Sequence, residues 1–188
     1  MRTFWELSLP EPQIRASPGR RFLALRGIAR VPPRSATSPG TRSSAERGRP
    51  GAPSAGERVI DTTVLIRHLT GDPPEQAARA AAYLRAESEL FLTDLVVAET
   101  IYVLESFYEA PRSQVAEAVR SLVALRSIVV VDVALLLRAV EVYETDRLDF
   151  AEAYLVACAE STGVGRVASF DRSINRVRSV ERVEPDIR

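Results

Sequence analysis

Four acidic residues occupy positions where a carboxylate is unusual and could take part in chemistry. Asp61 ends the apolar stretch that begins at Val59, and Asp171 follows the short run 166–170. Glu99 interrupts the apolar residues 95–98, and Glu152 lies within the largely apolar segment 148–156. An ionised carboxylate beside apolar surface costs free energy unless something pairs with it. A cluster of such residues, drawn from several elements, indicates a bound divalent cation and metal-dependent chemistry.

The two aspartates follow predicted strands, at 58–61 and 167–170. Binding sites of open α/β sheets form beyond the carboxyl ends of the strands, so we expect Asp61 and Asp171 to lie at such an edge. Thr63, two residues after Asp61, either bonds the Asp61 carboxylate or begins the following helix.

The two glutamates lie on predicted helices among apolar neighbours. Leu95 and Val103 stand four residues to either side of Glu99, which predicts that this side of the helix faces the protein. Glu152 has apolar neighbours at the same spacing. We therefore expect the two glutamates to meet the two aspartates at one pocket.

Like charges held close together raise each other's pKa values, so such a pocket requires neutralisation or a cation. Mg²⁺, with Mn²⁺ as a substitute, suits an all-oxygen site that lacks Cys and His. Asp149 is either a further ligand or the N-cap of the helix that carries Glu152. Any one of these acids, taken alone, could also cap a helix or lie on a solvated surface, because residues 59–188 contain 21 acids.

The elements that position these residues alternate between short β-type runs and helical patterns. Strands separated by helices predict a mainly parallel sheet covered on both faces, which is a three-layer α/β/α sandwich. Thr93 or Asp94 is expected to cap one helix and Ser113 the next. The predicted strands are 58–61, 90–92, 127–131, 167–170 and 180–183, and the predicted helices are 62–69, 74–86, 94–108, 114–125, 133–146 and 149–162.

The chain divides by composition into two parts, 1–57 and 58–188. The first part is rich in Arg, Pro, Ser and Gly and buries too little apolar surface to offset chain entropy, so we expect disorder there. It is interpreted either as a basic arm that binds RNA or as an extension that results from a start codon placed too far upstream. The second part is expected to be one folded domain with its own core.

Charge and cysteine content limit the classes of function. Residues 1–58 carry 11 Arg against 4 Glu, whereas residues 59–188 carry 14 Arg against 21 acids. The acidic part would not attract nucleic acid through its overall field, so RNA binding there needs local Arg residues or a metal. A single cysteine, Cys158, fits a reducing cytoplasm, and no segment has the roughly 18 to 20 apolar residues of a membrane span.

At these motifs the chain resembles the PIN-domain family, and in particular the VapC-type toxin ribonucleases of toxin–antitoxin modules. The resemblance covers about residues 59–188. It rests on the order and spacing of short motifs, with gaps of 38, 53 and 19 residues between successive acids. The motifs are Val-Ile-Asp61-Thr-Thr63-Val-Leu-Ile, Val-Ala-Glu99, Asp149-Phe-Ala-Glu152-Ala-Tyr-Leu-Val-Ala and Ser-Phe-Asp171-Arg.

This resemblance implies Mg²⁺-dependent cleavage of RNA, a homodimer, and inhibition by a cognate antitoxin. Asp61, Glu99, Glu152 and Asp171 would hold one or two cations. The family usually has Asp where Glu152 stands, and Asp149 could compensate for that difference. Apolar helices at 115–125 and 135–142 agree with a dimer. Arg147, Arg166, Arg172 and Arg176 lie near the motifs and could steer the RNA backbone.

Three other classes of protein are alternatives. A catalytically impaired PIN-like binding module is possible if the Glu152 substitution disables metal binding. A haloacid-dehalogenase-like phosphatase also begins with a strand-ending Asp, but it needs a second Asp where Thr63 stands. A receiver-type signalling domain uses a Lys in its acidic pocket, and this chain contains no Lys.

Overall fold

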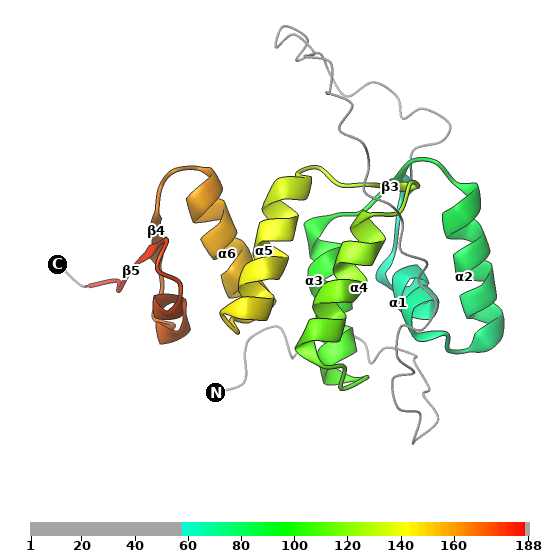
Figure 1. The fold of residues 1–188 in the computed structure, drawn as a ribbon, viewed down its shortest axis with the longest axis horizontal. Coiled ribbons are helices and arrows are strands. Elements are labelled where there is room, and N and C mark those ends of the chain that lie inside the picture. The colour runs from blue at the N-terminus through cyan, green and yellow to red at the C-terminus, as the bar shows by residue number, and fades with distance from the viewer. Residues whose placement is uncertain (1–57, 187–188) are drawn as a thin grey trace, which may run out of the picture.

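The computed structural model of this protein describes residues 58–186. Predictions for the Arg-rich segment 1–57, including disorder, lie outside the described residues. Among the described residues, six α-helices alternate with five short strands in the predicted order (Figure 1). The strands are β1 (Arg58–Val59), β2 (Leu90–Phe91), β3 (Ile128–Val129), β4 (Arg166–Ala168) and β5 (Glu181–Val183). The helices are α1 (Thr62–Thr70), α2 (Pro74–Ala86), α3 (Asp94–Ser106), α4 (Arg112–Val123), α5 (Val133–Thr145), α6 (Phe150–Ser161) and the 3₁₀ helix η2 (Arg172–Arg176).

All strand pairings are parallel, which confirms the α/β class and the mainly parallel sheet. β2 lies between β1 and β3, with Leu90 aligned to Arg58 on one side and to Ile128 on the other. β4 and β5 form a separate two-stranded sheet. In Figure 1 this second sheet lies at the opposite end of the described fold from β3, with α5 and α6 between them. The strands are also shorter than predicted.

The core is formed mainly where helices pack on helices. α5 and α6 share the most extensive contact, α4 packs on α5, and α1 packs on α2 and α3. The apolar stripes of α4 and α5 are buried inside this arrangement. Most side chains of these two stripes are therefore unavailable to a second copy, although Leu137 of α5 is 36 % exposed, and the dimer stays a prediction. Their buried members are Val115, Ala116, Ala118, Val119, Leu122, Leu136, Ala139, Val140 and Val142.

Local capping explains several helix starts. The Thr93 hydroxyl accepts a hydrogen bond from Val96 N, 3.3 Å away, so Thr93 rather than Asp94 caps α3. Pro73 and Pro74 open α2 as predicted. The expected cap at Ser113 was wrong, because α4 begins at Arg112 after Pro111, which has no side chain able to cap.

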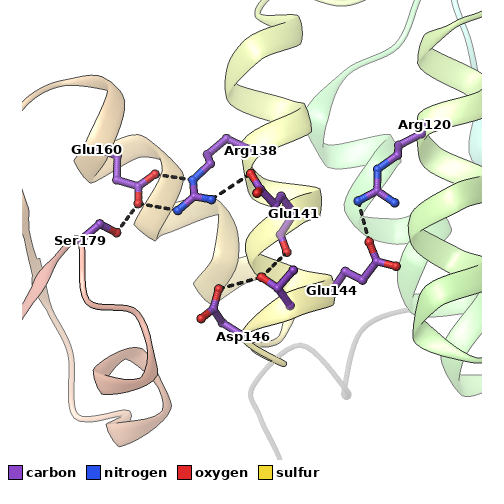
Figure 2. A network of polar contacts seen from close by, with 8 residues as sticks. Arg120, Arg138, Glu141, Glu144, Asp146, Glu160 and Ser179 are labelled. Atoms are coloured by element: carbon purple, nitrogen blue, oxygen red, sulfur yellow. Dashed lines mark hydrogen bonds and ion pairs between the residues drawn. The ribbon is translucent and has the colours of Figure 1, made fainter.

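A polar network fastens the C-terminal segment to the helices. Arg138 on α5 donates to both carboxylate oxygens of Glu160 on α6, at 2.7 and 2.9 Å. Ser179, just before β5, donates to Glu160 as well, and Figure 2 shows this chain of contacts together with the ion pair of Arg120 and Glu144. These contacts hold the second sheet against α6 and α5. Among the described helices, none has the length and apolarity needed to cross a membrane.

Candidate active site

Asp61 stands between β1 and α1, at the N-cap of that helix. Its Oδ1 accepts hydrogen bonds from the Thr63 backbone N–H at 2.9 Å and from the Thr63 hydroxyl at 2.5 Å. The prediction that Thr63 bonds this carboxylate is therefore confirmed. Because both bonds reach Oδ1, Oδ2 is left without a donor among the described residues. The carboxylate is exposed, so it is held in place and still accessible.

Glu99, in the middle of α3, is held by the first residue of α1. The Thr62 hydroxyl donates to Glu99 Oε2 at 2.6 Å, and Thr62 itself is buried. Glu99 is exposed and Leu95 is 78 % exposed, so the expectation that this side of α3 faces the core was wrong. The buried stripe of α3 is formed by Val97, Thr100, Ile101 and Leu104 instead. Leu95 and Glu99 turn to the surface, whereas Val103 on the same side packs against the core.

Asp61 and Glu99 line one cavity of about 710 Å³. The cavity is bounded by α1, α2 and α3, so its walls come from elements that pack on one another. Cationic, amide and aromatic side chains also line it: Arg67 of α1, and Gln76, Arg79 and Tyr83 of α2.

Glu152 belongs to a second acidic group. Its Oε2 is buried without a hydrogen-bond partner. Burial raises the pKa of Glu152, and the negative charges of Asp149 and Asp171 raise it further, against a backbone hydrogen bond that lowers it. An orphaned carboxylate oxygen near two further carboxylates is an arrangement that a cation would stabilise.

Asp171 and Asp149 differ in how they are held. Asp171 caps η2, with Oδ1 accepting from Ser173 N at 2.7 Å, and this hydrogen bond is the main cause of its lowered pKa. Asp149 occupies the N-cap position of α6 but makes no side-chain capping bond. Its Oδ1 lies 3.8 Å from Arg112 Nη2 instead. The Asp149 side chain therefore does not cap α6.

The structure does not bring the four predicted acids to one cavity. Asp61 and Glu99 line the cavity beside α1, whereas Glu152 and Asp171 are absent from its lining. The expectation of one shared pocket assumed that the carboxyl ends of β1 and β4 meet at one sheet edge. They do not, because these two strands belong to different sheets.

The donor chemistry suits a hard divalent cation, since each acidic group offers carboxylate oxygens free of hydrogen bonds. Within residues 58–186, however, no three or more Asp, Glu, His or Cys side chains are arranged as a metal-binding group. Asp61 and Glu99 share the cavity lining, and Asp149 and Asp171 lie close enough to Glu152 for their charges to raise its pKa.

The arginines of the cavity are not those that the sequence had suggested. Arg166 is paired with Glu181, and Arg176 donates to the Arg147 carbonyl. Arg67 and Arg79 line the cavity instead. Sequence reasoning missed them because they lie several residues from any acidic motif. Each arginine lies on a helix that lines the cavity, but this is apparent only once the packing of α1 on α2 is known.

Comparison with known proteins agrees with the motifs. No match was found among curated proteins. The family model for the PIN domain matches residues 58–180, which is most of the chain and almost all of its described part. Proteins with this domain are in general metal-dependent nucleases. The six helices, the parallel strands and this match show that the chain belongs to the PIN domain family.

Proposed function

We propose that this protein is a Mg²⁺-dependent ribonuclease that acts as the toxin of a type II toxin–antitoxin system. The observation that carries the proposal is the cavity where Asp61 and Glu99, two exposed carboxylates with free oxygens, are each held by a threonine of α1. Family membership supplies the class of reaction, the hydrolysis of phosphodiester bonds.

The carboxylates have separate parts in this proposal. Asp61 and Glu99 hold Mg²⁺, or Mn²⁺, in the cavity, while Thr63 and Thr62 keep their carboxylates oriented. Glu152, Asp149 and Asp171 supply the remaining negative charge of the metal-binding machinery, supported by the unpartnered Glu152 oxygen. When bound, the cation lowers the pKa of water and offsets negative charge that develops on phosphate.

Partners and location follow from the family resemblance rather than from a contact in the structure. We propose an RNA substrate, a cognate antitoxin, a homodimer and a cytoplasmic location.

The decisive experiment measures cleavage of a structured RNA by the full chain with Mg²⁺, with Mn²⁺ and with EDTA. Asp61→Asn should abolish cleavage and leave the fold intact, because Asn still caps α1 but loses the charge. Asp132→Asn is the matched control, since Asp132 caps α5 in the same way and lies outside the cavity lining. Full cleavage by Asp61→Asn would overturn the mechanism.

The two acidic groups are tested together by a double variant. If both serve one reaction, Asp61→Asn, Glu152→Gln and the combined variant should be equally inactive, because losses within one catalytic unit do not add. Normal cleavage by Glu152→Gln would remove the second group from the mechanism. A wild-type protein that binds RNA without cleaving it would favour the binding-module alternative.

A further inference from the structure

The cavity has a cationic side that the acidic residues do not explain. Arg67, in the last turn of α1, donates from Nε to Gln76 Oε1 at 2.9 Å and from Nη1 to the Asp72 carbonyl at 3.0 Å. Both acceptors are uncharged, so they orient the guanidinium without neutralising it. Nη2 keeps its donor capacity.

Arg79 lies on α2 and contributes a second guanidinium to the same cavity. In the part of the chain that the structure describes, neither Arg67 nor Arg79 is within ion-pair distance of a carboxylate. This contrasts with Arg58, Arg120 and Arg138, which all pair with acids. Two unneutralised guanidiniums in one cavity are the chemistry that binds phosphate oxygens.

The same cavity also contains an aromatic ring. Tyr83 lines the cavity one helical turn after Arg79. An aromatic side chain next to cations suits a single-stranded nucleic acid, whose bases stack while its phosphates meet the positive charge. An acidic protein segment would use the cations but not the ring, so the lining favours RNA.

We propose that Arg67 and Arg79 form a phosphate-binding subsite that holds the RNA strand next to the Asp61–Glu99 pair, with Tyr83 available to a base. The inference rests on the proposed ribonuclease function and names the residues that position its substrate. It also gives RNA a local contact on an acidic domain, since two guanidiniums without an acidic partner line the cavity. Arg67 and Arg79 are positioning residues in this scheme, not catalytic ones.

The test is metal-free binding of a short fluorescent single-stranded RNA to the full chain in EDTA, followed by anisotropy over a range of salt concentrations. Arg79→Gln should weaken binding roughly threefold to tenfold and reduce the salt dependence by about 0.7 in log–log slope. The matched control is Arg85→Gln, an exposed arginine of the same helix outside the cavity, which removes the same charge. The control also accounts for non-specific binding by the Arg-rich residues 1–57, which all variants share.

RNA binding by Arg67→Gln is the second measurement. Because this variant also loses the hydrogen bond to the Asp72 carbonyl, its thermal unfolding is measured to check that it is folded. Unchanged RNA binding by Arg79→Gln and by a folded Arg67→Gln would overturn the subsite, whatever the cleavage assay shows. Weaker binding of a Glu-rich peptide by Arg79→Gln, with RNA binding unchanged, would overturn it in favour of an acidic protein segment. If the two arginine variants bind RNA more weakly and the wild-type protein never cleaves RNA, the subsite is upheld and the ribonuclease is rejected.

Discussion

Thr62 Oγ1 lies 2.6 Å from Glu99 Oε2, so the first residue of α1 donates directly to the carboxylate in the middle of α3. Thr62 is 5 % exposed, so the donor of this bond is buried although its acceptor is exposed. Its neighbours Asp61 and Thr63 form the other bonded pair of the cavity. The N-terminus of α1 therefore orients both carboxylates at once.

Thr62→Val should lower both the stability of the protein and its cleavage activity. The change keeps the side-chain shape but removes the donor to Glu99, which should lower the free energy of unfolding by about 1 to 2 kcal/mol. Cleavage should fall because Glu99 is no longer oriented. Urea unfolding and kcat/KM with Mg²⁺ measure the two effects, and Thr62→Ser, which retains the hydroxyl, should restore most of the activity. If Thr62→Val cleaves like wild type, Glu99 does not need this contact.

Glu152→Gln should stabilise the metal-free protein near neutral pH. Burial raises the pKa of Glu152 above its usual 4.5, so the folded state binds this proton more tightly than the unfolded state. Wild-type stability is then lost as pH rises from the unfolded pKa through the folded one. Melting temperatures in EDTA should agree at about pH 3 and favour Glu152→Gln at about pH 7. A pH-independent difference would show that the Glu152 carboxyl is not destabilised by its surroundings.

Glu160→Gln should have the opposite pH profile. Hydrogen bonds from Arg138 and then from Ser179 lower the pKa of Glu160 against the effect of burial. Its contribution to stability is therefore present above the unfolded pKa and is lost as pH falls through the folded pKa. Glu160→Gln should cost about 1 to 2 kcal/mol at pH 7 and little at pH 3, measured by urea unfolding.

The matched control for this network is Glu181→Gln. Glu181 also pairs with an arginine, Arg166, but both side chains are more than 60 % exposed, at 64 % and 68 %. Solvent screening should leave this variant as stable as wild type. Equal losses in Glu160→Gln and Glu181→Gln would show that the network in Figure 2 has no special role.

Residues 1–57 should be dispensable for folding and for cleavage. A protein that begins at Glu57 retains β1 and every element of the described fold. We expect an unchanged melting temperature and unchanged cleavage of the same RNA by this shortened protein. Loss of a cooperative thermal transition would instead assign part of the segment to the fold.

Local features of this protein were readable from the sequence alone. The helices and the order of strands follow from hydrophobic periodicity and from the turn residues between them. The Thr93 cap and the Thr63–Asp61 bond could be predicted because each involves residues two or three apart. The same short motifs carried the family resemblance.

Tertiary packing determined which residues lie together, and spacing along the chain could not predict this. Glu99 faces a cavity rather than the core because α3 buries the stripe that contains Val97 and Ile101. The sequence has apolar residues on both sides of this helix, so it did not show which side would be buried. Glu152 and Asp171 are absent from the lining of the Asp61 cavity, and β4, which precedes Asp171, pairs with β5 and not with β1. Strand pairing joins residues distant in sequence, so no local signal specifies it. The arginines of the cavity likewise meet the acidic pair only because α1 packs on both α2 and α3.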